Sequence, residues 1–592
     1  MSTTSTLASS TFDPIEMDIL RHEILSIPNQ IERNIERSAF SPLVQEYKDY
    51  SVGFVDPKGA LVAQSRGSLP IFVANALGTG VREALSVHGA DKLLHGDAVL
   101  TNSAATLGQH LNNVVLLTPL RDSGEANGTL LGFFAVLVHW IDVGGSAPGS
   151  STGTGTTDVW QEGLQLPCMR LIDGGSRNDD LFRLCAVNSR FPRLLLGDLE
   201  AQLGGCMLGR DLMLDIVNRR GAGMVTATLE RMRGQARSAA EEILSSITPG
   251  EYAAESFLDG EDGVQVPVHV IVKPKAGRLN IDLSGLGKQM SGPSNAGRNG
   301  GAIAAARIAA KYVLNPHEPV NQGDFDLLDV DAPDGTFLTA SPDAPIGGSG
   351  NTIPTVVDTI LKALGQALPD RAAAAHHGTY GVHTLFGRLP GSGELFANLD
   401  TVAGGWGASA DADGAFPLRS NAHGDVPDIP AEMQEALYPF LLLARALLPD
   451  SGGAGRRRGG LGVEKIYSIR AACTVGLKFE RGLCPPWGLA GGLAGKACYV
   501  DIHRVDGETL RVWKGAYTLN PGDRMRVVSG GGGGYGPPIE RETGLVLADL
   551  SSGYITRAHA ERAYGVFTAA DGTLNRTATQ AHRRNMAAKF KD

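Results

Sequence analysis

The chain has 592 residues and a formal net charge of −10; 42% of its residues are hydrophobic and 20% are charged. This composition is typical of a soluble globular enzyme, and the length predicts several subdomains. The acidic balance argues against nucleic acid as a partner, because phosphate binding needs a basic surface. The one basic run, 456–458, lies beside Gly and Ser residues and is read as a solvated loop.

Neither the cysteines nor the hydropathy indicates export or a membrane partner. The six cysteines are scattered without a Cys-x-x-Cys pair, which favours a cytoplasmic location and argues against disulfides or a thiolate zinc site. The longest apolar stretch, 130–138, is much shorter than the about 20 residues that span a bilayer. Residues 1–11 lack arginines and an apolar core, so we expect a disordered tail and not a signal.

In chain order, the first predicted element is a helix that begins at Pro14 and is capped by Asp13. Its isoleucines recur at helical spacing: Ile15, Ile19, Ile24, Ile27 and Ile31. Two strands, 49–55 and 60–63, are predicted to flank a type I turn. A second helix is expected over 74–87.

The next apolar runs predict buried strands at 97–100, 114–117 and 130–138. After them, an Ala-, Leu-, Arg- and Glu-rich pattern predicts one long helix over 199–246. Thr248-Pro249-Gly250 is expected to end this helix.

Beyond residue 250 the pattern changes. Residues 251–345 predict short strands with Gly/Asp turns, and 354–368 predicts a helix. Residues 385–430 are expected to be loop-rich, and the chain from 459 to about 528 is strand-like. Helix and strand are both plentiful without strict alternation, so the predicted fold class is α+β (mixed α/β) with a strand-rich C-terminal part.

These changes in pattern divide the chain into five expected segments. They are a disordered tail at 1–11, an N-terminal metal-site subdomain at 12–246, a central α+β subdomain at 247–458, a strand-rich subdomain at 459–570 and a second tail at 571–592.

Glycine accounts for 77 residues, nearly twice its roughly 7% average share. The run Gly530–Gly534 lacks the Gly-Lys-Ser/Thr ending of a phosphate loop, so we predict a turn where backbones pack closely. Asn351-Thr352 is expected to cap the following helix; the alternative is that its N–H groups face an anionic intermediate. We find no nucleotide-binding fingerprint and no Ser-His-Asp arrangement.

Two histidine segments carry the strongest candidates for chemistry. His110 and His139 each stand three residues before an oxygen-bearing side chain, Asn113 and Asp142. Side chains three apart on a strand point to opposite faces, so each pair converges only in a turn, or only one member faces the site. With Asp49 as a third candidate, these groups suit Zn, Mn or Fe. The alternative is hydrogen-bonded core histidines and an aspartate in a turn.

Longer motifs extend along most of the chain, from about Phe12 to Thr568. They lie at 41–51, 139–150, 161–163, 197–199, 345–352, 404–407, 486–492, 530–536 and 564–566. Together they resemble the hydantoinase B/oxoprolinase family, which includes the B component of N-methylhydantoinase, one half of 5-oxoprolinase and the large subunits of acetone-type carboxylases.

The resemblance implies a divalent metal ion (Zn, Mn or Fe) whose ligands, by position, are Asp49, His110, Asn113 and His139. Two motifs depart from the family: its Asn-Asp-Pro is Asn102-Ser103-Ala104 here, and its His-Leu-Pro-Asp ends in Asn113. Asparagine can coordinate through its carbonyl but brings no charge, so a dication is expected to bind more weakly. Asp142 is the expected catalytic residue, orienting a ligating imidazole.

The resemblance also implies a hydantoinase A-type partner that binds ATP, which agrees with the missing nucleotide motif. Phosphorylation of an amide oxygen would remove the resonance that makes C–N rotation cost about 18–20 kcal/mol. A metal-activated water would then attack the carbon. The chain is therefore expected to be the metal-dependent subunit of an ATP-dependent hydrolase of cyclic amides of the hydantoin, oxoproline or lactam type.

Two alternatives remain open. One is the corresponding subunit of an ATP-dependent ketone carboxylase of the acetone or acetophenone type. The other is a non-catalytic assembly subunit with a decayed metal site, which Ser103 and Asn113 favour and the retained histidines oppose. Chain length favours the hydrolase, because carboxylase large subunits tend to be longer.

Overall fold

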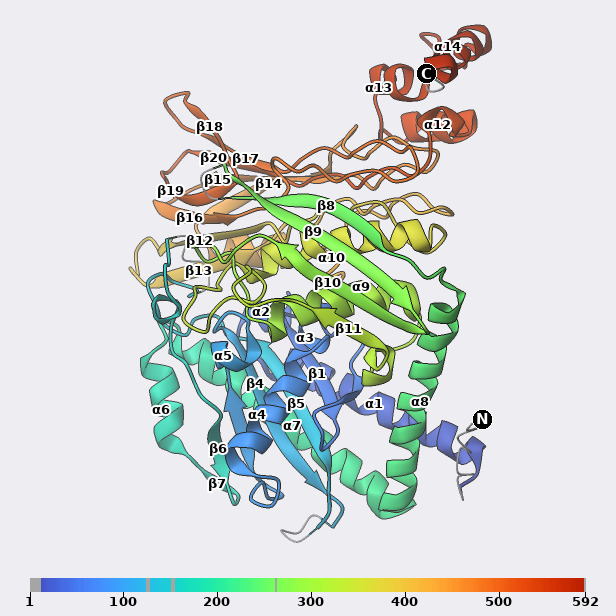
Figure 1. The fold of residues 1–592 in the computed structure, drawn as a ribbon. Helices are drawn as coiled ribbons and strands as arrows, with labels where there is room; N and C mark the ends of the chain where they lie inside the picture. The colour runs from blue at the N-terminus through green and yellow to red at the C-terminus, as the bar shows by residue number, and fades with distance from the viewer. Residues whose placement is uncertain (1–11, 124–127, 151–154, 261–262, 590–592) are drawn as a thin grey trace, which may run out of the picture.

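The computed structural model describes residues 12–123, 128–150, 155–260 and 263–589, so the tail predicted at 1–11 lies outside the described residues. The fold is mixed α and β, as predicted. Figure 1 shows the blue-to-cyan N-terminal sheet at the bottom, a green and yellow layer above it, and an orange strand-rich layer on top.

The N-terminal layer is built on an antiparallel seven-stranded sheet, in the order β2-β1-β5-β4-β3-β6-β7. Its strands are β1 (Tyr50–Val55), β2 (Leu61–Gln64), β3 (Ala98–Thr101), β4 (Asn113–Arg121), β5 (Leu130–His139), β6 (Met169–Asp173) and β7 (Ser176–Arg177). The first five confirm the predicted strands. Helices α3 (Pro70–Val73) and α4 (Ala76–His88) contact β1, and α4 confirms the second predicted helix.

Helix α1 (Pro14–Ser38) begins where the sequence predicts, and the Asp13 carboxylate accepts a hydrogen bond from the Ile15 N–H at 2.9 Å. Its buried face differs from the prediction, because Ile15 and Ile19 are 70% and 49% exposed. The core-facing stripe runs instead through Met17, Leu20, Ile24, Ile27, Ile31 and Ile35, which keeps the helical period but starts elsewhere. The short helix α2 (Pro42–Gln45) follows and packs against α1.

The single long helix predicted over 199–246 is wrong. The structure has α7 (Pro192–Arg220) and α8 (Ala222–Ser246). Gly221 separates them with φ +84°, a backbone conformation that glycine adopts readily and that ends a right-handed helix. Helix α7 packs against α1, β4 and β5, and also against the preceding helix α6 (Asp179–Val187).

The central layer contains a four-stranded sheet in the order β11-β10-β9-β8, which contacts α9 and α10. Its elements are β8 (Tyr252–Asp259), β9 (Gln265–Lys275), β10 (Arg278–Leu286), α9 (Ala304–Leu314), β11 (Leu328–Asp331) and α10 (Ser349–Ala367). The sequence did not predict α9. Helix α10 begins ahead of its predicted start, so Pro354 lies inside it.

The C-terminal layer has two further sheets, in the orders β13-β12-β16-β19 and β14-β15-β20-β17-β18. Their strands are β12 (Val382–Arg388), β13 (Leu395–Asp400), β14 (Phe440–Leu447), β15 (Val463–Ile469), β16 (Cys473–Lys478), β17 (Tyr499–His503), β18 (Thr509–Val512), β19 (Lys514–Leu519) and β20 (Arg524–Val528). Strands β12 to β14 precede residue 459 and share these sheets with later strands. The expected boundary at 458–459 therefore falls inside both sheets.

The segment expected to be loop-rich, 385–430, contains most of the β12–β13 hairpin and is irregular only after it. Helix α11 (Ala431–Leu437) then leads into β14. Three helices, α12 (Thr543–Ser551), α13 (Arg557–Tyr564) and α14 (Arg576–Lys589), project at one upper corner of Figure 1. Helix α14 lies in the segment expected to be a tail.

Glycine-rich segments from distant parts of the chain pack backbone to backbone, which explains much of the glycine excess. The Gly405 N–H donates to the Gly530 carbonyl at 3.1 Å, and the Gly532 N–H donates to the Gly460 carbonyl at 2.9 Å. A Cβ atom on Gly532 would overlap the Trp406 carbonyl. The predicted close packing at 530–534 is confirmed, although several extended segments build it instead of one turn.

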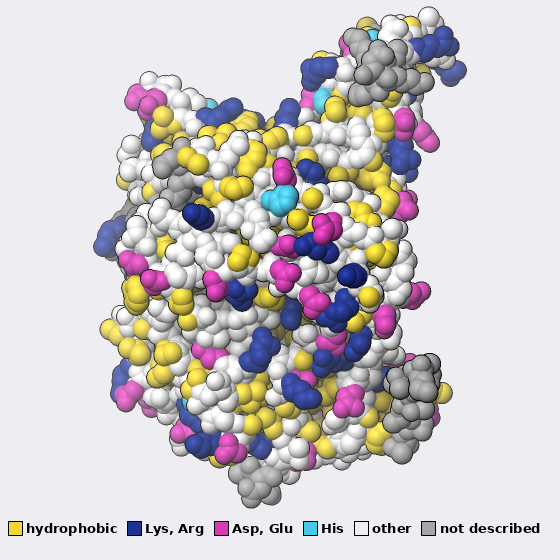
Figure 2. Space-filling model, viewed as in Figure 1, with side chains coloured by type: hydrophobic (Ala, Val, Ile, Leu, Met, Phe, Trp, Pro, Cys, Tyr) yellow, Lys and Arg dark blue, Asp and Glu magenta, His cyan; other side chains and the backbone are white. Residues whose placement is uncertain are grey.

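The six cysteines are free, as the sequence predicts, and all of them are buried. Among the described helices, none is long and apolar enough to cross a bilayer. On the face shown in Figure 2, basic and acidic side chains are interspersed.

Candidate metal centre

Three of the predicted ligands form a row across neighbouring strand ends. Asn113 is the first residue of β4, His139 is the last of β5, and Asp49 directly precedes β1. Asn113 pairs with His139 in the β4–β5 register. On the other side of β5, the His139 N–H donates to the Asp49 carbonyl at 3.0 Å. Residues that pair directly across strands share a face of the sheet, so the topology brings these side chains together.

His110 reaches the same place from a turn. Gly108, with φ +66°, ends the short helix α5 (Ala104–Leu107), and the chain then turns into β4. The His110 and His139 ring centroids lie 4.9 Å apart. The Asn113 Nδ2 atom lies 3.3 Å from His110 Nε2 and donates to Gln109 Oε1 at 3.3 Å. His110 and Asn113, which are three residues apart, therefore converge in a turn.

Four buried polar atoms at this centre have no hydrogen-bond partner among the described residues. They are Asp49 Oδ1, His110 Nδ1, Asn113 Oδ1 and His139 Nδ1. All four residues line one cavity of about 40 Å³. Buried polar groups normally have partners, and each one left without costs about 1–3 kcal/mol. Because the four atoms lie around one cavity, they indicate a bound ligand that would supply their missing partners.

Burial sets the charge state of these groups. It raises the pKa of Asp49 to about 7, because the carboxylate loses its hydration. Burial lowers the pKa of His139 to about 4, and burial together with His139 and Lys478 lowers the pKa of His110 well below its usual value. Both imidazoles are therefore neutral at pH 7, the form that coordinates metals.

The donor set fits a divalent cation in kind, with two neutral imidazoles, one carboxylate and one amide oxygen. It is poor in charge, since Asp49 supplies the one carboxylate among the four residues. Over the described part of the chain, no group of three or more His, Cys, Asp and Glu side chains converges tightly enough to hold a metal ion. That finding covers Asp49, His110 and His139, so these three side chains do not form a ready ligand set by themselves.

Asp142 does not contact the imidazoles. Its buried carboxylate accepts hydrogen bonds from the N–H groups of Gly144, Gly149 and Arg190 at 2.9–3.1 Å, and from the Arg190 guanidinium at 2.9 Å. The expected role as orienter of a ligating histidine is not what this geometry provides. Asp142 instead fixes the loop after β5 to the start of α7.

The opposite wall of the cavity comes from residues distant in the sequence: Asn351 of α10, Tyr380, His423 and Lys478 of β16. The Tyr380 and His423 rings stack 3.6 Å apart, and the Lys478 ammonium donates to the Gly347 carbonyl at 3.1 Å. The sequence around Asn351 favours a helix cap, with a position facing the reaction site as the alternative, and the structure places Asn351 on this cavity. Tyr380, His423 and Lys478 carry no local signal at all.

Glu162 supports this wall from behind. Its carboxylate accepts hydrogen bonds from the Ile346 and Gly347 N–H groups at 3.0 and 2.7 Å. It therefore holds the loop that leads into α10, which explains why the motif at 161–163 accompanies the motif at 345–352.

The fold and the cavity describe a layered α and β protein with a buried pair of histidines. Comparison with known proteins gives its family. Residues 13–538 match the family model described as hydantoinase B/oxoprolinase. The chain belongs to this family, which confirms the resemblance in the sequence.

Individual relatives span nearly the whole chain. A putative D-/L-hydantoinase component of the B type, from a Pseudomonas species, is 27% identical over 573 residues, covering 94% of this chain and 95% of the relative. The crystal structure of the ATP-dependent caprolactamase from Pseudomonas jessenii superposes with a TM-score of 0.87 at 26% identity, covering 97% of this chain and 100% of that one. A nucleotide-free acetone carboxylase has the same fold, with a TM-score of 0.87 at 19% identity over 98% of this chain and 83% of that one.

Proposed function

We propose that this chain is the metal-dependent subunit of an ATP-dependent hydrolase of cyclic amides, acting with a hydantoinase A-type partner that binds ATP. The observation that carries the proposal is the set of four unpartnered buried atoms on one cavity, from Asp49, His110, Asn113 and His139. A bound divalent ion would polarise the substrate oxygen and lower the pKa of a water molecule.

The residues of the chain prepare this chemistry in three ways. The two neutral imidazoles and the Asp49 carboxylate offer lone pairs from rigid strand ends, where packing fixes their positions. The stacked Tyr380 and His423 rings close the opposite wall and limit access of bulk water. Asn351 and Lys478 face the same cavity and belong equally to a second one beside it.

Relatives support the choice of a hydrolase over a carboxylase. The caprolactamase matches at higher identity than the acetone carboxylase and is covered over its full length. The relatives named as subunits support the requirement for a partner protein.

The test combines the purified chain with its ATP-binding partner, ATP and a panel of lactams and hydantoins, and measures ring-opened product and ADP. We expect coupled release of both, abolished by His110→Ala and by His139→Ala. The matched control is His269→Ala, a partly exposed histidine of β9, which should keep full turnover. Turnover that needs a ketone and bicarbonate instead would favour the carboxylase, and unchanged turnover in both site variants would exclude this centre.

A further inference from the structure

The Asn351 side chain is a buried carboxamide whose carbonyl oxygen has no hydrogen bond inside the described protein. It occupies the third position of α10 and is 6% exposed, and its Oδ1 atom has no partner. The capping role expected from the sequence is absent, because Gly348 is the N-cap and no side chain caps this helix. A buried amide that does not cap its helix and leaves its oxygen unpaired is suited to bind a ligand.

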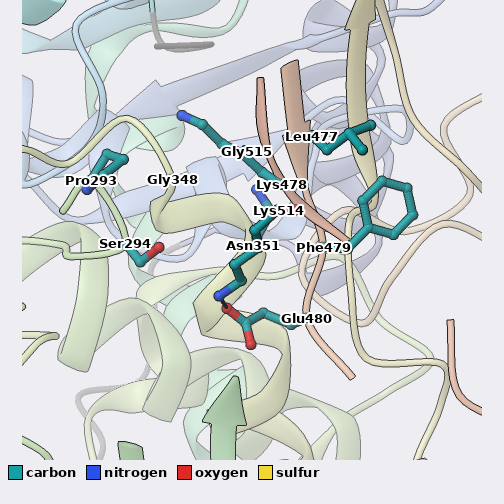
Figure 3. A pocket seen from close by; sticks show the side chains of 10 residues that line it. All are labelled: Pro293, Ser294, Gly348, Asn351, Leu477, Lys478, Phe479, Glu480, Lys514 and Gly515. Atoms are coloured by element: carbon teal, nitrogen blue, oxygen red, sulfur yellow. Dashed lines mark hydrogen bonds and ion pairs between the residues drawn. The ribbon is translucent and has the colours of Figure 1, made fainter. Parts of the chain in front are cut away.

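Asn351 stands where two cavities meet. It lines the 40 Å³ cavity of the candidate metal centre and also a second cavity of about 140 Å³. Figure 3 shows the second cavity, with Asn351 near Glu480; Leu477 of β16 and Phe479, directly after that strand, also line it. A small ring held in the second cavity would therefore present one edge to Asn351, beside the metal centre.

The chemistry of a carboxamide selects the group that fits. It offers an N–H donor and a carbonyl acceptor side by side. A lactam or cyclic imide is a cis amide, so its own N–H and C=O also lie on one edge, in the complementary order. The two edges join through two parallel hydrogen bonds, in the same manner as asparagine reads adenine. A ketone offers only an acceptor and makes one bond.

We propose that Asn351 is the specificity-determining residue of the site and recognises secondary cyclic amides through this paired contact. The contact holds the carbonyl carbon at the border of the metal cavity. In its choice of ligand class the inference rests on the proposed hydrolase function. Its test needs no metal, no ATP and no partner protein. The inference about Asn351 and the proposed hydrolase function can therefore fail separately.

The experiment measures binding of three five-membered rings to the full chain by titration NMR: 2-pyrrolidinone, N-methyl-2-pyrrolidinone and cyclopentanone. Only the first has an amide N–H. We expect the wild type to bind 2-pyrrolidinone at least about tenfold more tightly than the other two, since a site built for a hydrogen bond rejects analogues that lack it. Asn351→Leu should bind 2-pyrrolidinone at least about tenfold more weakly than the wild type, without preference among the three.

Two further variants serve as controls. Asn351→Asp keeps the size of the side chain but loses the donor, so it should also weaken 2-pyrrolidinone binding. This variant provides the test if the leucine variant fails to fold. Ser294→Ala changes the same cavity without touching the carboxamide and should keep the wild-type preference. Equal binding of the three probes by the wild type, or a preference retained in Asn351→Leu, would overturn the inference even if metal-dependent turnover is found.

Discussion

Asn113 and His139 are direct partners across the β4–β5 ladder. Their side chains therefore leave the same face of the sheet, at the end of the strands where Asp49 also lies. These two residues, far apart in the chain, become neighbours because β4 and β5 pair as antiparallel strands from Asn113 and His139 onward. The position of the asparagine is thus fixed by the sheet, and only its chemistry departs from a carboxylate ligand.

Replacing Asn113 with Asp tests that departure. The variant adds a second carboxylate at a position already aimed at the cavity, and charge strengthens the interaction with a dication. We expect divalent-metal affinity to rise by at least about tenfold, equivalent to about 1.4 kcal/mol. Competition titration against a chelator measures it. Affinity that stays the same or falls would mean that residue 113 is not a ligand.

Asp142→Asn distinguishes a structural role from an imidazole-orienting one. The substitution replaces Oδ2, which accepts a charge-assisted hydrogen bond from the Arg190 guanidinium, with an NH2 group that cannot accept it, and such a bond is worth about 1.5–3 kcal/mol. We expect the free energy of unfolding to fall by about that amount while metal content stays at the wild-type level. Urea unfolding and elemental analysis of the same preparation provide both values. Lost metal with unchanged stability would restore the role expected from the sequence.

The backbone-to-backbone packing of the glycine-rich segments leads to a prediction about stability. Gly532→Ala places a methyl group against the Trp406 carbonyl, and because backbone on both sides cannot yield, we expect a loss of at least about 3 kcal/mol. Gly234→Ala is the matched control. That glycine is an exposed helical residue with nothing within 4 Å of an added Cβ, so alanine should stabilise by about 0.5–1 kcal/mol. Thermal unfolding of the two variants separates these outcomes, and equal melting temperatures would contradict the interlocked packing.

Glu480 predicts a pH dependence. Burial raises its pKa to about 7 from 4.5, although Lys514 opposes the shift. Between these values the folded state keeps a proton that the unfolded state releases, so stability falls as pH rises from about 4.5 to about 7 and then levels off. The contribution is on the order of 3 kcal/mol.

Unfolding of the wild type and of Glu480→Gln in urea at about pH 4.5 and about pH 8 measures this contribution. Glutamine cannot ionise, so between the lower and the higher pH the free energy of unfolding should fall more for the wild type than for Glu480→Gln. A difference that is the same at both pH values would show that the carboxyl group is not desolvated as the structure implies.

Local sequence signals predicted the N-terminal elements well and failed at particular places. Asp13 marks the start of α1, and apolar runs mark β1 to β5. The break at Gly221 was missed because glycine is tolerated within a helical pattern. Helix α9 was missed because its Ala-rich sequence follows Gly-rich chain and carries little polar face, as its nearly complete burial requires.

The site shows the same division. Asp49, His110, Asn113 and His139 were predicted together from local motifs and the family resemblance, and the sheet register brings them to one cavity. The pairing of Asp142 with Arg190 spans 48 residues, and no local pattern announces it. Lys478 reaches the cavity from a different sheet. Such long-range contacts depend on tertiary packing, which short sequence motifs do not encode.

Elemental analysis of the purified chain, beside His110→Ala, His139→Ala and the control His269→Ala, decides whether the four residues form a metal centre. We expect close to one equivalent of Zn, Mn or Fe in the wild type and the control, and none in either site variant, with all four proteins folded. A wild type that stays metal-free after incubation with each ion, or metal that persists in both site variants, would show that this cavity holds no metal.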